Sequence, residues 1–164
     1  MNHEFKQMLP KDNKIMFPHR IAPEKQVEIF RDLKEQLPQY EFVICQETQL
    51  TKNEYHNMLG EAKLVFSANL QETLGISWYE GAIVDAIPMV PNRLSYSEMA
   101  LDHFKYPSEW TLNFDSYLAH RQEICYNIIQ YMNNYTHFLP YVRKQVDFLT
   151  EEYFSADRLL EMIK

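Results

Sequence analysis

The chain has 164 residues, a length that fits one domain with a sizeable buried core. Apolar residues make up 46% and charged residues 24%, ordinary values for a globular protein. The formal net charge of −7 argues against a dedicated nucleic-acid-binding surface, because such a surface normally carries an excess of Lys and Arg.

Several common signals are absent from the sequence. No apolar run approaches the roughly 20 residues that a membrane-spanning helix needs, and residues 1–8 lack the apolar stretch of a secretory signal. Cys45 and Cys125 lie far apart, so we expect no disulfide scaffold and a reducing, cytoplasmic location. The histidines show no metal-ligand spacing, and there is no Walker loop or G-x-G-x-x-G segment.

Residues 1–13 are polar and are predicted to form a tail or linker. After them, short apolar segments alternate with segments of helical periodicity. Strands are predicted at residues 14–17, 41–45, 63–67 and 87–90. Helices are predicted at residues 23–37, 51–59, 75–84, 115–133, 139–150 and 155–163, with a capping box at the start of the second.

The predicted strands are apolar throughout and alternate with helices. This is the pattern of a parallel sheet that is covered by helices on both faces. We therefore predict one α/β domain, a Rossmann-like parallel sheet over residues 14–164, with additional helices at its C-terminal end.

Three polar segments follow predicted strands: residues 20–25 (RIAPEK), 72–80 (ETLGISWYE) and 92–98 (NRLSYSE). In open parallel sheets, ligands bind at the edge where the strands end. Arg20 and Lys25 could supply the cations that a diphosphate needs, and a helix beginning at Gly75 could supply free N–H groups. Glu72 and Glu80 could accept hydrogen bonds from sugar hydroxyls.

Each of these features is common by itself. An Arg and a Lys five residues apart at a helix start usually form a solvated surface, and two glutamates eight residues apart arise by chance. Trp78 and Tyr79 are expected in the core or an interface rather than stacked on a ligand. For His19, a donor role near a phosphate and a plain loop role are equally open. The order and the strand context of the three segments together indicate a nucleotide site.

The same segments resemble a known family. Glu72 and Glu80 form the E-x7-E pattern of retaining glycosyltransferases of GT-B fold, and residues 20–25 resemble their phosphate-binding R-x4-K segment. Residues 67–77 and 87–90 are similar to the family's stretch around the first glutamate and to the strand that follows. The resemblance covers about residues 14–164. Residues 17–20 (FPHR) and 91–98 are similar to segments of the tRNA-queuosine mannosyltransferase-like group, which implies a nucleic-acid-linked acceptor.

The resemblance implies the donor-binding, C-terminal half of a GT-B enzyme that transfers a sugar from a nucleotide-diphosphate donor with retention of configuration. It implies no metal and no cofactor. The implied site residues are Arg20, Lys25 and Glu72 for catalysis, and Thr73, Leu74, Gly75 and Glu80 for donor binding.

The sequence also departs from the family. Ala86 stands where a glycine is usual, and the N-terminal, acceptor-binding half is missing, so we expect the isolated domain to be inactive. One alternative is a non-catalytic nucleotide-binding or assembly module of the same fold. Another is an unrelated flavodoxin-like nucleotide binder.

Overall fold

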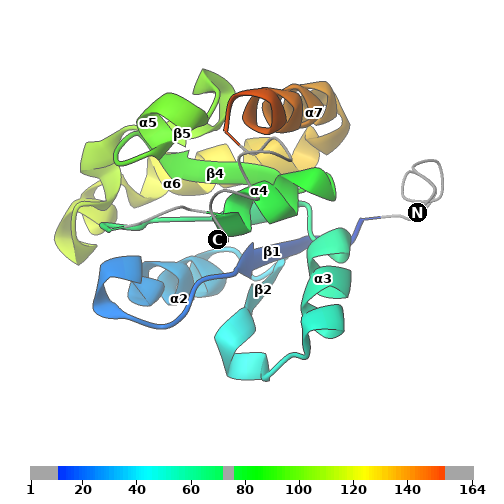
Figure 1. Cartoon of the computed structure of the whole chain (residues 1–164). Coiled ribbons are helices and arrows are strands. Elements are labelled where there is room, and N and C mark those ends of the chain that lie inside the picture. Colours follow the sequence, from blue (N-terminus) through cyan, green and yellow to red (C-terminus); the bar gives the residue numbers. More distant parts are fainter. Residues whose placement is uncertain (1–10, 72–75, 154–164) are drawn as a thin grey trace.

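The computed structural model describes residues 11–71 and 76–153 (Figure 1). A five-stranded sheet with the order β2-β1-β3-β4-β5 forms its centre, and every neighbouring pair of strands is parallel. The strands are β1 (Lys14–Phe17), β2 (Glu41–Ile44), β3 (Leu64–Phe66), β4 (Ile87–Pro91) and β5 (Lys105–Tyr106). The predicted Rossmann-like α/β fold is confirmed.

Helices lie on both faces of this sheet. The α-helices of the described residues are α2 (Val27–Gln36), α3 (Lys52–Glu61), α4 (Ile76–Ile83), α5 (Tyr96–Met99), α6 (Phe114–Asn133) and α7 (Tyr135–Glu152). Short 3-10 helices are η1 (Pro23–Lys25), η2 (Cys45–Thr48), η3 (Asp102–Phe104) and η4 (Ser108–Thr111).

The alternation of side chains along β1 shows why the strands are apolar throughout. Ile15 and Phe17 pack into one core cluster with Phe30 of α2, whereas Met16 packs into a second cluster with Leu59 of α3. Successive strand residues point to opposite faces, and here both faces are covered. Burying each such side chain contributes about 1.5–3 kcal/mol.

The structure corrects several predicted boundaries. The helix expected from Pro23 is the 3-10 turn η1 followed by α2, because Gln26 between them has a left-handed backbone with φ 55°. Helix α7 begins four residues before the predicted start and contains Pro140 inside the helix, where proline removes one backbone donor. The sequence missed β5, because two residues are too short for a recognisable pattern. The helix predicted at residues 155–163 lies outside the described residues.

The end of the predicted tail is joined to the domain. The backbone N–H of Asp12 donates to the carbonyl of Glu61 at 2.9 Å, and Lys63 Nζ donates to Asn13 Oδ1 at 3.0 Å. Residues 12 and 13 therefore lie against the connection between α3 and β3.

Helix α4 approaches β3 closely at Gly81. A Cβ atom at this position would lie 2.8 Å from Cγ2 of Val65, a buried β-branched side chain with little rotational freedom. We expect Gly81→Ala to lower the free energy of unfolding by about 1–3 kcal/mol, as overpacking does. Gly60→Ala is the control, because a Cβ in α3 would meet nothing within 4 Å and should add about 0.5–1 kcal/mol of stability. Urea denaturation measures both, and an unchanged Gly81→Ala protein would contradict this packing.

Candidate functional site

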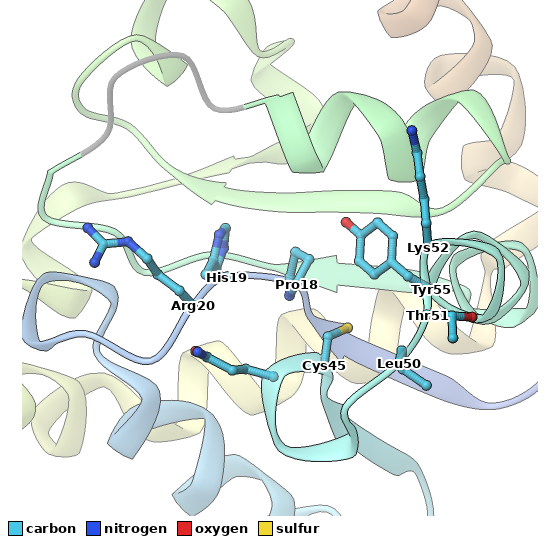
Figure 2. A pocket seen from close by; sticks show the side chains of 9 residues that line it. Pro18, His19, Arg20, Cys45, Leu50, Thr51, Lys52 and Tyr55 are labelled. Carbon is cyan, nitrogen blue, oxygen red and sulfur yellow. The ribbon is translucent and has the colours of Figure 1, made fainter.

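A pocket of about 380 Å³ opens at the carboxyl ends of β1 and β2 (Figure 2). Its walls come from the loop after β1, from η2 and from the start of α3. The lining residues are Pro18, His19, Arg20, Cys45, Gln46, Leu50, Thr51, Lys52 and Tyr55. The chain runs from β1 to its neighbour β2 and then crosses to β3 on the other side of β1, so the connections reverse direction between β1 and β3. Open α/β sheets bind ligands at such a reversal, and the pocket shares the carboxyl end of β1 with it.

The pocket is cationic although the chain is acidic. Arg20 and Lys52 bring positive charge, and no carboxylate is among the described side chains that line it. Burial raises the pKa of the Cys45 thiol to about 12, so this group brings no negative charge. The start of α3, with the predicted capping box of Thr51 and Glu54 confirmed, adds the positive end of a helix dipole. These walls favour an anionic ligand.

The two cations predicted from the sequence lie near each other in different environments. Arg20 is exposed, and its Nη2 donates to Glu24 Oε1 at 2.8 Å. Lys25 is only 7% exposed, and its Nζ donates to the carbonyl of Gln71 at 3.2 Å. After burial, the Lys25 charge is the next cause that lowers the pKa of His19, a residue that lines the pocket.

Glu80 of α4 lies near the opposite wall. Its Oε2 is 3.6 Å from Nε2 of His56 on α3. Burial raises the pKa of Tyr55, and the Glu80 carboxylate raises it further, so this charge is felt at a residue that lines the pocket. The remaining predicted site residues, Glu72, Thr73, Leu74 and Gly75, lie outside the described residues.

His19 forms part of the pocket wall. Its side chain is buried, with the residue 6% exposed, and its ring lies edge-on to Phe17 with centroids 5.0 Å apart. The ring has a hydrogen bond with the backbone of Phe66, while Nε2 has no partner among the described residues. Burial first, and then the Lys25 charge, lower its pKa to about 3, so the imidazole is neutral at physiological pH.

The third predicted segment follows β4 as expected, but its arginine has a structural role. The Arg93 guanidinium donates to four backbone carbonyls at 2.7–3.1 Å, those of Ala68, Asn69, Ser108 and Thr111. The buried Tyr96 hydroxyl lies 3.0 Å from Ser67 Oγ. This segment therefore fixes the loop after β3, whereas Glu98 is exposed.

Gln26 fixes the same loop from the other side. Its Nε2 donates to the carbonyls of Ala68 and Thr111 at 2.7 and 2.6 Å, and the N–H of Leu70 donates to the Glu24 carbonyl at 2.7 Å. The loop after β3 is thus held between η1 and the loop after β4.

The sequence reasoning missed one wall of the pocket. Gln46, Lys52 and Tyr55 follow β2, a strand whose carboxyl end the sequence analysis did not consider. Gln46 Oε1 accepts a hydrogen bond from the backbone N–H of Ile21, which joins the loops after β1 and β2. The strand-end argument that selected Arg20 would have found this wall if it had been applied to the second strand.

The fold and the pocket define an α/β domain with a crevice that is lined by cationic side chains. No protein-family model and no curated protein matches the chain. Among solved structures, TarM matches with a TM-score of 0.70 and 15% identity, over 96% of this chain and 35% of TarM. A point mutant of S. aureus TarM in complex with fondaparinux, α-GlcNAc-glycerol and UDP matches with the same TM-score and identity, over 95% and 36% of the two chains. At this identity the likeness is one of fold, and the chain spans about a third of the length of TarM.

Neither a membrane span nor a metal cluster is found in the part of the chain that the structure describes. Within residues 11–71 and 76–153, no helix combines the length and the apolar character needed to cross a membrane. In the same residues, no three side chains of His, Cys, Asp or Glu form a group that could hold a metal ion.

Replacing Arg93 tests its structural role. Arg93→Gln leaves several carbonyls without their donor, and a buried unpaired polar group costs about 1–3 kcal/mol, so we expect a loss of at least about 2 kcal/mol. Arg31→Gln is the control, because the Arg31–Glu47 ion pair is exposed and should contribute less than about 1 kcal/mol. Chemical denaturation compares the two variants. Equal losses would rule out the special role of Arg93.

The neutral state of His19 predicts a pH dependence of stability. Between pH 6.5 and about 4, an unfolded histidine binds a proton that folded His19 does not, so the wild type loses stability as the pH falls. Relative to His19→Asn, we expect this loss to reach about 1.4 kcal/mol per pH unit. Above about pH 7.5 the difference between the two proteins should not change with pH. Denaturation at a series of pH values measures it, and a constant difference throughout would contradict the low pKa.

Proposed function

We propose that this domain binds a nucleotide-diphosphate sugar and is the donor-binding half of a retaining GT-B glycosyltransferase. The observation that carries the proposal is the cationic pocket at the carboxyl ends of β1 and β2, beside Arg20 and Lys25. The fold likeness to TarM, one structure of which holds UDP, supports a nucleotide as the ligand.

Arg20 and Lys25 are proposed to neutralise the diphosphate. As the bond between the sugar and the diphosphate breaks, negative charge grows on the leaving group, and fixed cations stabilise that charge in the transition state. Arg20 is held by Glu24 in this structure, so a diphosphate has to share or replace this carboxylate. Lys25 is already buried, which strengthens its field.

The glutamates are proposed to bind hydroxyl groups. Glu80 would hold the ribose hydroxyls, and its influence on Tyr55 supports a position beside the pocket. Glu72 would orient the transferred sugar, and backbone N–H groups of residues 73–75 would bind the diphosphate. The reaction would need no metal and no cofactor.

The acceptor side is also a proposal. A second, N-terminal domain would bind the acceptor, and a nucleic acid is the acceptor class implied by the resemblance of residues 17–20 and 91–98. The isolated domain would then bind the donor but transfer no sugar. We propose that the protein lies in the cytoplasm. The alternative is a non-catalytic nucleotide-binding or assembly module of the same fold.

One observation favours a second candidate function. The strand order 2-1-3-4-5 is that of flavodoxin-like proteins, which bind a mononucleotide such as FMN at the switch point between β1 and β3. Both functions would use the carboxyl end of β1, so the identity of the bound ligand distinguishes them.

Calorimetric titration of the full chain with UDP, GDP, their sugars and FMN tests the proposal. We expect one nucleoside diphosphate to bind, and Arg20→Ala to weaken it by about tenfold or more, as the loss of a charge-assisted contact does. Glu24→Gln should strengthen binding, because Arg20 loses a competing carboxylate. Arg31→Ala, which removes an exposed arginine outside the pocket, should change nothing.

Three different results would contradict the proposal, and each has its own meaning. Preferential binding of FMN would support the flavodoxin-like function. No binding to folded protein at millimolar ligand would support the non-catalytic module. Equal effects of Arg20→Ala and Arg31→Ala would show that the ligand lies elsewhere.

A further inference from the structure

The ring of His19 carries an unused hydrogen-bonding atom. Nε2 is buried and has no partner among the described residues, although the ring lines the pocket. Buried polar atoms in folded proteins are nearly always paired, so an unpaired one at a pocket wall calls for an explanation. Figure 2 shows the ring between Arg20 and Tyr55, among the side chains that surround the pocket.

The hydrogen bond with Phe66 determines what Nε2 can do. Since Nε2 has no partner in the described part of the chain, the bond with the backbone of Phe66 is made by Nδ1. A neutral imidazole that donates through Nδ1 has a lone pair, and no proton, on Nε2. The surroundings keep the ring neutral, because burial, and after it the charge of Lys25 of η1, lower the pKa of His19. The other ionisable groups among the described lining residues are Cys45, Lys52 and Tyr55, and none is a carboxylate.

An acceptor in a cationic pocket selects a particular kind of ligand group. The phosphate oxygens of a nucleotide diphosphate are acceptors and cannot pair with a lone pair. Its hydroxyl groups can donate, on the ribose or on the sugar. We propose that His19 accepts, at Nε2, a hydrogen bond from a hydroxyl group of the nucleotide sugar and thereby positions it. This inference rests on the proposed function and adds a positioning residue to it.

The role differs from the phosphate-donor role that the sequence left open for His19. A donor to phosphate would have its proton on Nε2 and would gain from protonation. An acceptor from a hydroxyl keeps the neutral ring and discriminates against ligands that lack the hydroxyl. A site with a buried polar group rejects such analogues because its own atom is left unpaired.

A comparison of two His19 variants with the wild-type full chain tests the inference. The probes are UDP, 2′,3′-dideoxy-UDP and UDP-N-acetylglucosamine, with the corresponding guanine nucleotides and GDP-mannose in parallel, and the readout is calorimetric affinity at about pH 7.5, where the imidazole is neutral. The variants are His19→Phe, which removes the acceptor, and His19→Gln, whose amide oxygen can replace it. Thermal unfolding confirms that each variant is folded.

Two patterns support the inference and identify the hydroxyl. If the ribose donates, the wild type prefers the ribonucleotide to the dideoxynucleotide by about tenfold, and His19→Phe loses this preference. If the sugar donates, His19→Phe binds the diphosphate normally but loses about tenfold in affinity for the nucleotide sugar. In either case His19→Gln restores part of the lost preference.

Other results overturn it. If His19→Phe weakens all ligands by the same factor, or none of them, no hydroxyl is recognised while the proposed function survives. Nitrogen NMR of His19 gives an independent readout, and a protonated Nε2 in the complex would replace the acceptor role with a phosphate contact. If the wild type binds no nucleotide at all, the proposed function fails together with this inference, and that result is distinct from selective failure of the variants.

Discussion

The arrangement of the loops after β1, β3 and β4 depends on how the buried carbonyl groups after β3 are satisfied. Gln26 supplies one donor from the loop after β1, and Arg93 supplies several from the loop after β4. Because an unpaired buried carbonyl costs about 1–3 kcal/mol, the two donors together stabilise this path of the loop. The network therefore ties three strand ends together and fixes the edge of the sheet on which Lys25 and His19 lie.

The charges at this edge follow from the same arrangement. The chain is acidic as a whole, yet the pocket brings together Arg20, Lys52 and the start of α3. Burial and the Lys25 charge keep His19 neutral, so the proposed site would combine cations for phosphate groups with an acceptor for hydroxyls. A nucleotide sugar offers both kinds of group, and this match in chemistry is why the role proposed for His19 is consistent with the proposed function.

Part of the site could be predicted because parallel strands end at one edge. This geometry alone places Arg20 and Lys25 beside the crevice. It does not tell which polar side chain faces a ligand and which is used by the fold: Arg93 has the same residue type and the same kind of position as Arg20, yet it binds backbone carbonyls. The sequence also could not show that Arg20 is exposed and Lys25 is buried, because burial depends on segments distant in the sequence.

The sequence by itself determined the fold class, four of the five strands and the edge that carries the site, because apolar alternation with helices is a local pattern. Only the tertiary structure decided the strand order, the short β5, the break at Gln26 and the pocket wall formed by Lys52 and Tyr55. Each of these depends on contacts between residues far apart in the chain. Sequence periodicity indicates which side chains are buried, but it does not indicate which distant residues they contact.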